Sequence, residues 1–282
     1  TLDGCHAVPG YWYGKNSAFS LFGAGPALGM DGNNFLSWME YGGGRELYSE
    51  LLTKMANVNV ISFLSGPMPT QPLGWFKKPI TSAAQIKGLK YRTTGLSIDV
   101  FKQMGAAVNA LFDGEIVQAM DRGALDAAEF NNASSDRALG LARGSKHCML
   151  QSYHRPAETF EVLFNKRRYD VLPPDLKAIA GYAAQAASAD MSWKAIHRYS
   201  EDYNELREKE GVRFHRTPDD VLRAQMQAWG VITQRKSREN PFFKKVLDAQ
   251  LKWAGRTVGW SLEAIVHPRM AYNHWFGKKA TA

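Results

Sequence analysis

The feature that most constrains the fold is the segment from Pro174 to Gly211, which has no further proline and is interrupted only by Gly181. Ala, Leu, Glu and Lys are abundant in it. Pro174 suits the first turn of a helix, and Asp175 favours the positive N-terminal end. At ~1.5 Å per residue, one continuous helix would run about 50 Å. Because one lobe does not need such a length, we expect a helix that crosses two lobes as a spine.

Short strands alternate with helices in the rest of the chain, which indicates an α/β protein with largely parallel sheets. The apolar patterns predict strands at residues 58–63, 107–111, 125–130 and 159–164, with helices at 97–104 and 114–120. Beyond the spine, Thr217 to Asp220 caps a helix at 221–238. Pro241 begins a further helix, which carries Trp253 and Trp260.

The composition favours a globular protein with an acidic small ligand or an anionic surface as partner. The 35 Lys and Arg against 27 Asp and Glu give a net charge of +8, but the charges are dispersed, so nucleic acid is a weaker interpretation. No apolar run reaches the ~18–20 residues of a membrane span. Cys5 and Cys148 fit no metal spacing and are either a pair or two free thiols.

Signals for catalysis and for nucleotide binding are weak. Gly42 to Gly44 lacks the Gly-Lys-Ser/Thr of a P-loop, and no nucleophile elbow occurs. The seven histidines show no metal-ligand pairing at helical spacing, so core or surface roles are their default. Glu158 and Glu161 fall on alternate faces of a predicted strand, a poor arrangement for acid/base work.

Polar residues recur instead at strand ends and in the loops that follow them. Arg92 ends a short run beside a turn at Gly95, Glu129 and Phe130 end another, and Tyr153 to Arg155 lie in a loop. Ligands of open α/β sheets collect at the carboxyl ends of strands. An arginine fork suits bidentate capture of a carboxylate, although an edge-strand arginine in water or in a structural ion pair is the alternative for Arg92.

These motifs, taken together and in order, resemble the solute-binding subunits of tripartite ATP-independent periplasmic (TRAP) transporters, in the branch that binds α-keto and related monocarboxylates. The matching pieces span nearly the whole chain: residues 11–16, 40–47, 71–76, 87–92, 114–116, 126–129, 153–156, 165–166 and 172–176. They are far more specific for the family than for the ligand.

The resemblance implies a two-lobe, periplasmic-binding-protein-like fold (type II) with a spine helix across both lobes. We expect residues 1–90 and 159–198 in lobe I, and 91–158 and 199–282 in lobe II with the C-terminal helices. Family members begin with a signal peptide and a strand-helix-strand-helix unit before the position of Leu2. We therefore expect that the chain lacks its N-terminus and part of the first sheet.

By motif, Arg92 resembles the family's carboxylate-binding arginine, while Gln71, Glu129 and Phe130 match positions that hold a cation in this branch. The fourth cation ligand there is the acid of a Trp-His-Glu-Pro motif, which here reads Tyr153-His154-Arg155-Pro156. We expect Arg155 to replace the metal, with no cofactor. The alternative for Arg155 is a position on the surface, and the alternative for Phe130 is packing in the core. Tyr11 is either a contact at the cleft rim or simple packing.

The resemblance implies a periplasmic, non-catalytic protein that delivers a small 2-oxo or 2-hydroxy monocarboxylate to TRAP membrane subunits. Gln71 and Glu129 are expected to take the ligand oxygens beside the carboxylate. Two alternatives are a catalytic protein with Glu129 as base and a sensor domain with the same fold. A homodimer through the C-terminal helices is a further expectation.

Overall fold

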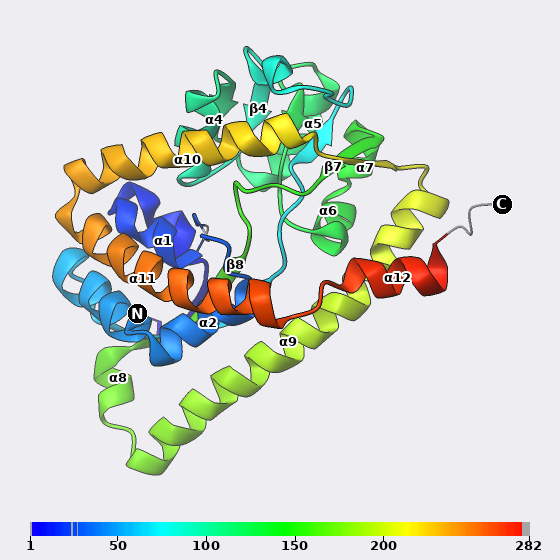
Figure 1. Ribbon diagram of the computed structural model, residues 1–282. Coiled ribbons are helices and arrows are strands. Elements are labelled where there is room, and N and C mark those ends of the chain that lie inside the picture. Colours follow the sequence, from blue (N-terminus) through cyan, green and yellow to red (C-terminus); the bar gives the residue numbers. More distant parts are fainter. Residues whose placement is uncertain (1, 24, 27, 278–282) are drawn as a thin grey trace.

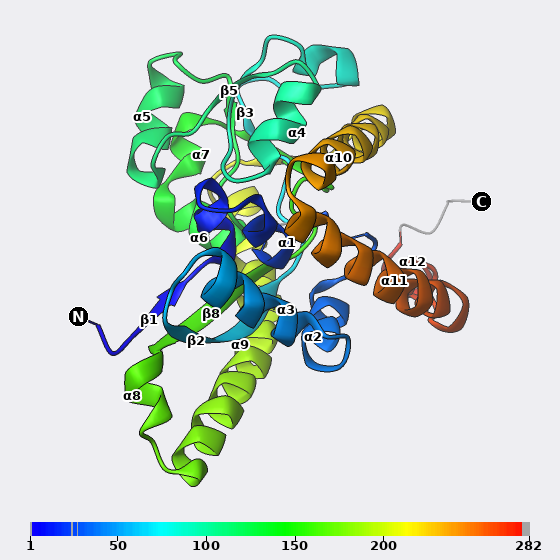
Figure 2. The same cartoon turned by 90° about the vertical axis from the view of Figure 1, so that its left-hand side faces the viewer.

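The computed structural model describes residues 2–23, 25–26 and 28–277 (Figure 1). They form two sheets with helices around them, and one long helix runs past both. Figure 2 shows the elements of the six-stranded sheet above those of the three-stranded sheet. The α/β class predicted from the sequence is therefore confirmed.

The smaller sheet has the order β1-β8-β2 and is antiparallel throughout. Its strands are β1 (Gly4–Ala7), β8 (Glu158–Asn165) and β2 (Val60–Met68). Beside it lie α2 (Gly32–Tyr41) and α3 (Gly44–Glu50), which are separated by Gly42 and Gly43. Phe22, Trp38 and Leu51 are fully buried in the apolar core of this half.

The larger sheet has the order β5-β4-β6-β3-β7-β9. Its strands are β5 (Ala107–Asn109), β4 (Lys90–Arg92), β6 (Ala127–Ala128), β3 (Gly74–Phe76), β7 (His147–Leu150) and β9 (Arg213–Arg216). β4 runs parallel to β5 and β6, and β7 to β9, whereas β3 is antiparallel to both of its neighbours. Parallel pairing thus holds for part of this sheet only.

The helices cover the sheets and link them. Those not yet given are α1 (Ser20–Gly23), α4 (Ser97–Gln103), α5 (Ile116–Asp121), α6 (Ala133–Leu139), α7 (Leu141–Gly144), α8 (Lys166–Asp170), α9 (Pro174–Glu208), α10 (Asp219–Glu239), α11 (Pro241–Ala264) and α12 (Pro268–Phe276). Short 3-10 turns are η1 (Pro9–Gly14), η2 (Ser17–Phe19), η4 (Ala83–Ile86) and η5 (Asp113–Glu115), and a π-helical turn, η3 (Leu51–Met55), ends α3.

The spine helix predicted from composition is α9, a continuous helix of 35 residues. It packs against β2 of the smaller sheet and against α6 beside the larger one, so it does touch both halves (Figure 1). Its exposed apolar side chains include Trp193 and Ile196. A polar, alanine-rich helix of this kind is held by its contacts with both halves rather than by a core of its own.

The division into lobes stays a proposal. β3 lies inside the range assigned to lobe I, yet it pairs with β6 and β7 in the larger sheet. The apolar patterns predict no strand in residues 65–79, which hold four prolines. In the structure this range contains the end of β2 and the whole of β3. Strands of three residues carry too few side chains to show a period.

Two further sequence questions concern membranes and cysteines. None of the described helices is both long and apolar enough to cross a membrane. Cys5 is exposed and Cys148 is buried, and both are free thiols. Of the two interpretations that the sequence left open, the structure therefore shows the unpaired one.

Candidate functional site

Arg92 is the last residue of β4, and its guanidinium is buried with a partner on each nitrogen. Nε donates to the carbonyl of Leu111 at 3.0 Å, and Nη1 donates to the carbonyl of Glu129 at 2.9 Å. Nη2 donates to Oδ1 of Asp113 at 2.9 Å. Two backbone carbonyls thus fix the plane of the fork, and the Asp113 carboxylate is one of the two that balance its charge.

Glu129 follows β6 and is completely buried beside three basic groups. Arg92 Nη1 lies 3.5 Å from its Oε1, and His154 Nε2 lies 3.9 Å from its Oε2. Burial alone would raise the pKa of Glu129, but Arg155, His154 and Arg92 together lower it to about 2. Among the described residues neither of its carboxylate oxygens receives a hydrogen bond. Glu129 is therefore a buried anion with free acceptor capacity.

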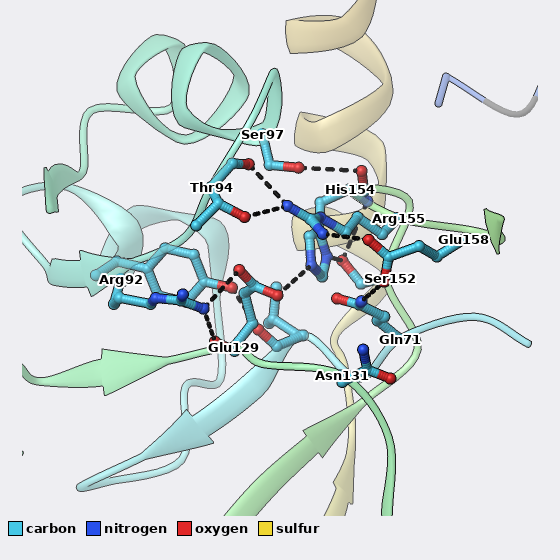
Figure 3. A network of polar contacts seen from close by, with 12 residues as sticks. Gln71, Arg92, Thr94, Ser97, Glu129, Asn131, Ser152, His154, Arg155 and Glu158 are labelled. Carbon is cyan, nitrogen blue, oxygen red and sulfur yellow. Dashed lines mark hydrogen bonds and ion pairs between the residues drawn. The ribbon is translucent and has the colours of Figure 1, made fainter. Parts of the chain in front are cut away.

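His154 is fully buried, and its neighbours set its tautomer (Figure 3). Ser152 Oγ accepts from Gln225 Nε2 at 2.7 Å and from the His154 backbone amide at 3.3 Å, which occupies both of its acceptor positions, and it lies 2.5 Å from His154 Nδ1. The hydroxyl proton is thus donated to Nδ1, which leaves the ring proton on Nε2, toward Glu129. Burial lowers the pKa of His154, so the ring is neutral near pH 7. Gln225, on α10, holds this loop by a second hydrogen bond from the backbone of Tyr153.

Arg155 and Glu158 form a buried ion pair that Gln71 and Thr94 extend (Figure 3). Arg155 Nη1 donates to Glu158 Oε1 at 2.7 Å, and Nη2 donates to the carbonyl of Thr94 at 3.0 Å. Gln71 Nε2 donates to Glu158 Oε2 at 2.7 Å. Arg155 Nε and Gln71 Oε1 are buried with no partner among the described residues. The surface alternative for Arg155 is thereby excluded.

Tyr11 lies on η1, which runs against the turn that follows β4. A Cβ built on Gly95 would lie 3.6 Å from the carbonyl of Gly10 and 3.7 Å from Arg155 Nη2. The pKa of Tyr11 is raised by the part of its side chain that the protein covers, and then by the carboxylates of Glu158 and Asp113. Tyr11 therefore sits at the rim of the charged cluster.

Phe130 is half-buried, and its ring packs against the apolar cluster around Trp75 and Leu125. This packing agrees with the alternative role of Phe130, that of a core residue. The structure thus brings Gln71, Arg92, Glu129 and Arg155 together, with Tyr11 at the edge and Phe130 beside the core. Sequence reasoning missed Asp113, His154 and Glu158 as members. An acid three residues after Arg155, at the start of a predicted strand, was the available signal for Glu158.

A second buried acid, Asp136 on α6, gives a pH prediction. Burial raises its pKa to about 7, although Trp75 Nε1 and the Asn131 amide donate to it. The Asp136 carboxyl therefore keeps its proton in the folded protein up to about pH 7, whereas the unfolded chain releases this proton near pH 4. The stabilisation of the folded state by this proton is fully present below pH 4 and is lost as the pH rises through 7. Relative to Asp136→Asn, the wild-type free energy of unfolding should fall by about 1.4 kcal/mol per pH unit between pH 5 and 7.

Urea unfolding of both proteins at pH 5, 6, 7 and 8 measures this difference. The asparagine variant loses one acceptor, which costs about 1–3 kcal/mol at every pH and does not affect the slope. If the free energies of unfolding of the two proteins changed in parallel with pH, Asp136 would not titrate between pH 5 and 8.

Residues 1–239 match the protein family described as bacterial extracellular solute-binding protein, family 7 (DctP). The chain belongs to this family. The match covers both sheets and the spine helix, and every residue of the charged cluster lies within it. The resemblance inferred from the ordered motifs is thereby confirmed.

One family relative is the monocarboxylate 2-oxoacid-binding periplasmic protein all3028 of Nostoc sp. (strain PCC 7120 / SAG 25.82 / UTEX 2576). It is 34% identical to this chain over 191 residues, which are 68% of this chain and 51% of the relative. The chain therefore spans about half the length of this curated relative.

Solved structures of family members share the fold. A TRAP periplasmic solute-binding protein from Colwellia psychrerythraea, with bound calcium and pyruvate, is 27% identical with a TM-score of 0.87. One from Pseudoalteromonas atlantica T6c, with bound sodium and pyruvate, is 26% identical with a TM-score of 0.85. Each alignment covers 97% of this chain and 81% of the solved chain. The two-lobe binding-protein fold predicted from the sequence is therefore confirmed.

The prediction that no cofactor takes part, with Arg155 in place of a metal, is wrong. Both pyruvate-bound relatives hold a cation together with the carboxylate. The cluster itself fits a hard cation, because both oxygens of Glu129 and Oε1 of Gln71 are buried and receive no hydrogen bond from the part of the chain that the structure describes, and oxygen is the ligand that calcium prefers. Arg155 does not exclude a cation from the cluster, because Glu158 neutralises its charge.

Proposed function

We propose that this family member is an extracytoplasmic solute-binding protein of a TRAP transporter that captures a small monocarboxylate, a 2-oxo or 2-hydroxy acid. The observation that carries the proposal is the buried cluster of Arg92, Glu129 and Arg155 at the strand ends of the larger sheet, next to the segments that join it to the smaller one. The pyruvate bound to two relatives supports the ligand class.

Each group has a task in this proposal. Arg92 grips the ligand carboxylate, and Arg155 Nε, which is buried without a partner in residues 2–23, 25–26 and 28–277, donates to a further ligand oxygen. Charge-assisted hydrogen bonds of this kind contribute roughly 1.5–3 kcal/mol each. Gln71 Oε1 and the Glu129 carboxylate would hold a calcium or sodium ion, which supplies positive charge for the ligand oxygens. Tyr11 closes the rim.

The same proposal makes the protein a periplasmic partner of TRAP membrane subunits and not an enzyme. The name of the Nostoc relative supports the location. Glu129, the base of the catalytic alternative, has a pKa of about 2 and would be a weak base. Enclosure of the ligand between the halves would change the surface that the membrane subunits meet.

Isothermal titration with pyruvate, in sodium, in calcium and after chelation in a sodium-free buffer, tests this function. We expect stoichiometric binding without turnover, and weaker binding once both cations are removed. Arg92→Lys should bind at least about tenfold more weakly, because an ammonium cannot reproduce the fork. If a panel of 2-oxo and 2-hydroxy acids gave no binding, or if the acid were consumed, the proposal would fail.

We also propose a homodimer through the C-terminal helices. α12 buries no residue, and Met270, Tyr272, Trp275 and Phe276 are all more than 60% exposed. Figure 2 shows this helix at the end of α11, to the right of the two sheets. A second copy would cover these side chains without any other partner.

Analytical ultracentrifugation of the wild type and of Trp275→Ala/Phe276→Ala tests the dimer. The double variant should be monomeric at concentrations where the wild type is dimeric. Trp193→Ala on α9, which removes a side chain of similar exposure, is the matched control and should leave the dimer intact. A monomeric wild type would refute the proposal.

A further inference from the structure

Asp113 occupies the part of Arg92 that an incoming carboxylate needs. Arg92 Nε and Nη1 are tied to backbone carbonyls, which cannot move without disturbing the strand ends. Among the described residues, Nη2 is the guanidinium nitrogen whose hydrogen bond goes to a side chain, the Asp113 carboxylate at 2.9 Å, while Nη1 has only a looser ion pair with Glu129 at 3.5 Å beside its backbone bond. A ligand carboxylate that pairs with Arg92 therefore meets a carboxylate already in place.

The surroundings allow Asp113 to leave. Its side chain is 47% exposed, whereas that of Arg92 is 4% exposed. It lies on the single turn η5, and a Cβ built on the next residue, Gly114, would meet nothing within 4 Å. Phe112, on the other side, is 84% exposed. The loop thus has space to swing, while Arg92 stays fixed.

Two carboxylates cannot share the same edge of one guanidinium without repulsion, since each is an acceptor and both carry negative charge. Binding at Arg92 is then an exchange of one carboxylate for another. The net gain from Arg92 is then the difference between these two pairings, which is less than the full energy of a charge-assisted hydrogen bond. The ligand has to gain its affinity from further contacts, such as Arg155 Nε and the oxygens of Glu129 and Gln71 with their cation.

We propose that Asp113 is a built-in competitor for the ligand carboxylate and a specificity-determining residue of the site. It sets a threshold: simple acids such as formate or acetate do not displace it, whereas acids with an additional oxygen next to the carboxylate do. The inference rests on the proposed function, because it takes Arg92 as the carboxylate clamp.

Titrations of the wild type, Asp113→Asn and Asp113→Ala with pyruvate, acetate and formate test the threshold. Both variants should bind all three acids at least tenfold more tightly than the wild type, with the alanine variant at least equal to the asparagine one. Glu115→Gln removes one negative charge from the same turn and keeps the acceptor for the Phe112 amide, so its affinities should stay within twofold of the wild type. Unchanged or weaker binding by the Asp113 variants overturns the proposal.

Formate separates this outcome from failure of the proposed function. Formate is small enough to reach any free guanidinium, whatever the natural ligand. If neither the wild type nor the Asp113 variants bind a 2-oxo or 2-hydroxy acid, the proposed function is wrong. Thermal unfolding in formate, compared with chloride at equal ionic strength, still tests whether Asp113 competes for Arg92. Asp113→Ala should then gain stability in formate that the wild type and Asp113→Ala/Arg92→Lys lack. Equal shifts in all three would overturn the competitor role.

Discussion

Replacing Glu129 by glutamine is expected to lower the free energy of unfolding by about 3–5 kcal/mol, the cost of leaving buried charge without its partner. The carboxylate is fully buried and stands between Arg92, Arg155 and His154. An amide of the same shape keeps the packing but removes the negative charge. Its NH2 group would also face the guanidinium of Arg92 in one of its two orientations. Urea unfolding at pH 7 measures the loss.

Glu161→Gln is the matched control for this variant. Glu161 is as deeply buried, but its partners are the hydroxyls of Tyr48 and Ser62 rather than cations. Burial raises the pKa of Glu161. Since a neutral amide can accept both hydroxyl hydrogen bonds, the control should cost less than about 1 kcal/mol. Equal losses in the two variants would mean that the charge of Glu129 is not what stabilises the cluster.

The second large effect is expected at the pair of Arg155 and Glu158. Arg155→Gln and Glu158→Gln should each cost about 3–5 kcal/mol, because each leaves the other charge buried and unpaired. The double variant should cost much less than the sum, since it removes both charges. A double-mutant cycle by urea unfolding gives the coupling energy directly.

The exposed pair of Lys194 and Asp190 on α9 provides the comparison. Its Nζ and Oδ2 atoms lie 2.6 Å apart, but both side chains are more than half exposed. Exposed pairs at this helical spacing couple by about 0.3–0.5 kcal/mol. Additive losses at Arg155 and Glu158, with a coupling energy as small as that of the exposed pair, would contradict a buried ion pair.

The sequence predicts the parts of the site that follow from chain position. Arg92 and Glu129 end short strands, and the parallel pairing of β4 and β6 brings those ends together. The spine could be read from composition, because a long segment without proline has few other structures available. The family motifs identified Gln71, although pattern alone gave it no role.

The missed residues depend on contacts that no local pattern encodes. Glu158 was set aside because Glu161 lies on the other face of β8, yet Glu158 serves Arg155 while Glu161 serves Tyr48. His154 gains its tautomer from Gln225, which lies on a distant helix. The helix α6 is not among the helices predicted from the sequence, and Asn132 caps it by accepting from two backbone amides. In each case the role of the residue is set by contacts that form only in the folded protein.

Gln71 and Arg155 lie on two different segments that join the sheets, and the Gln71 amide donates to the Arg155 carbonyl at 3.1 Å. The joint between the halves is therefore built from two residues of the proposed site. If the proposed function holds, we expect bound ligand to stiffen this joint, so that the hydrogen-exchange rate of the Gln71 amide falls as the site fills.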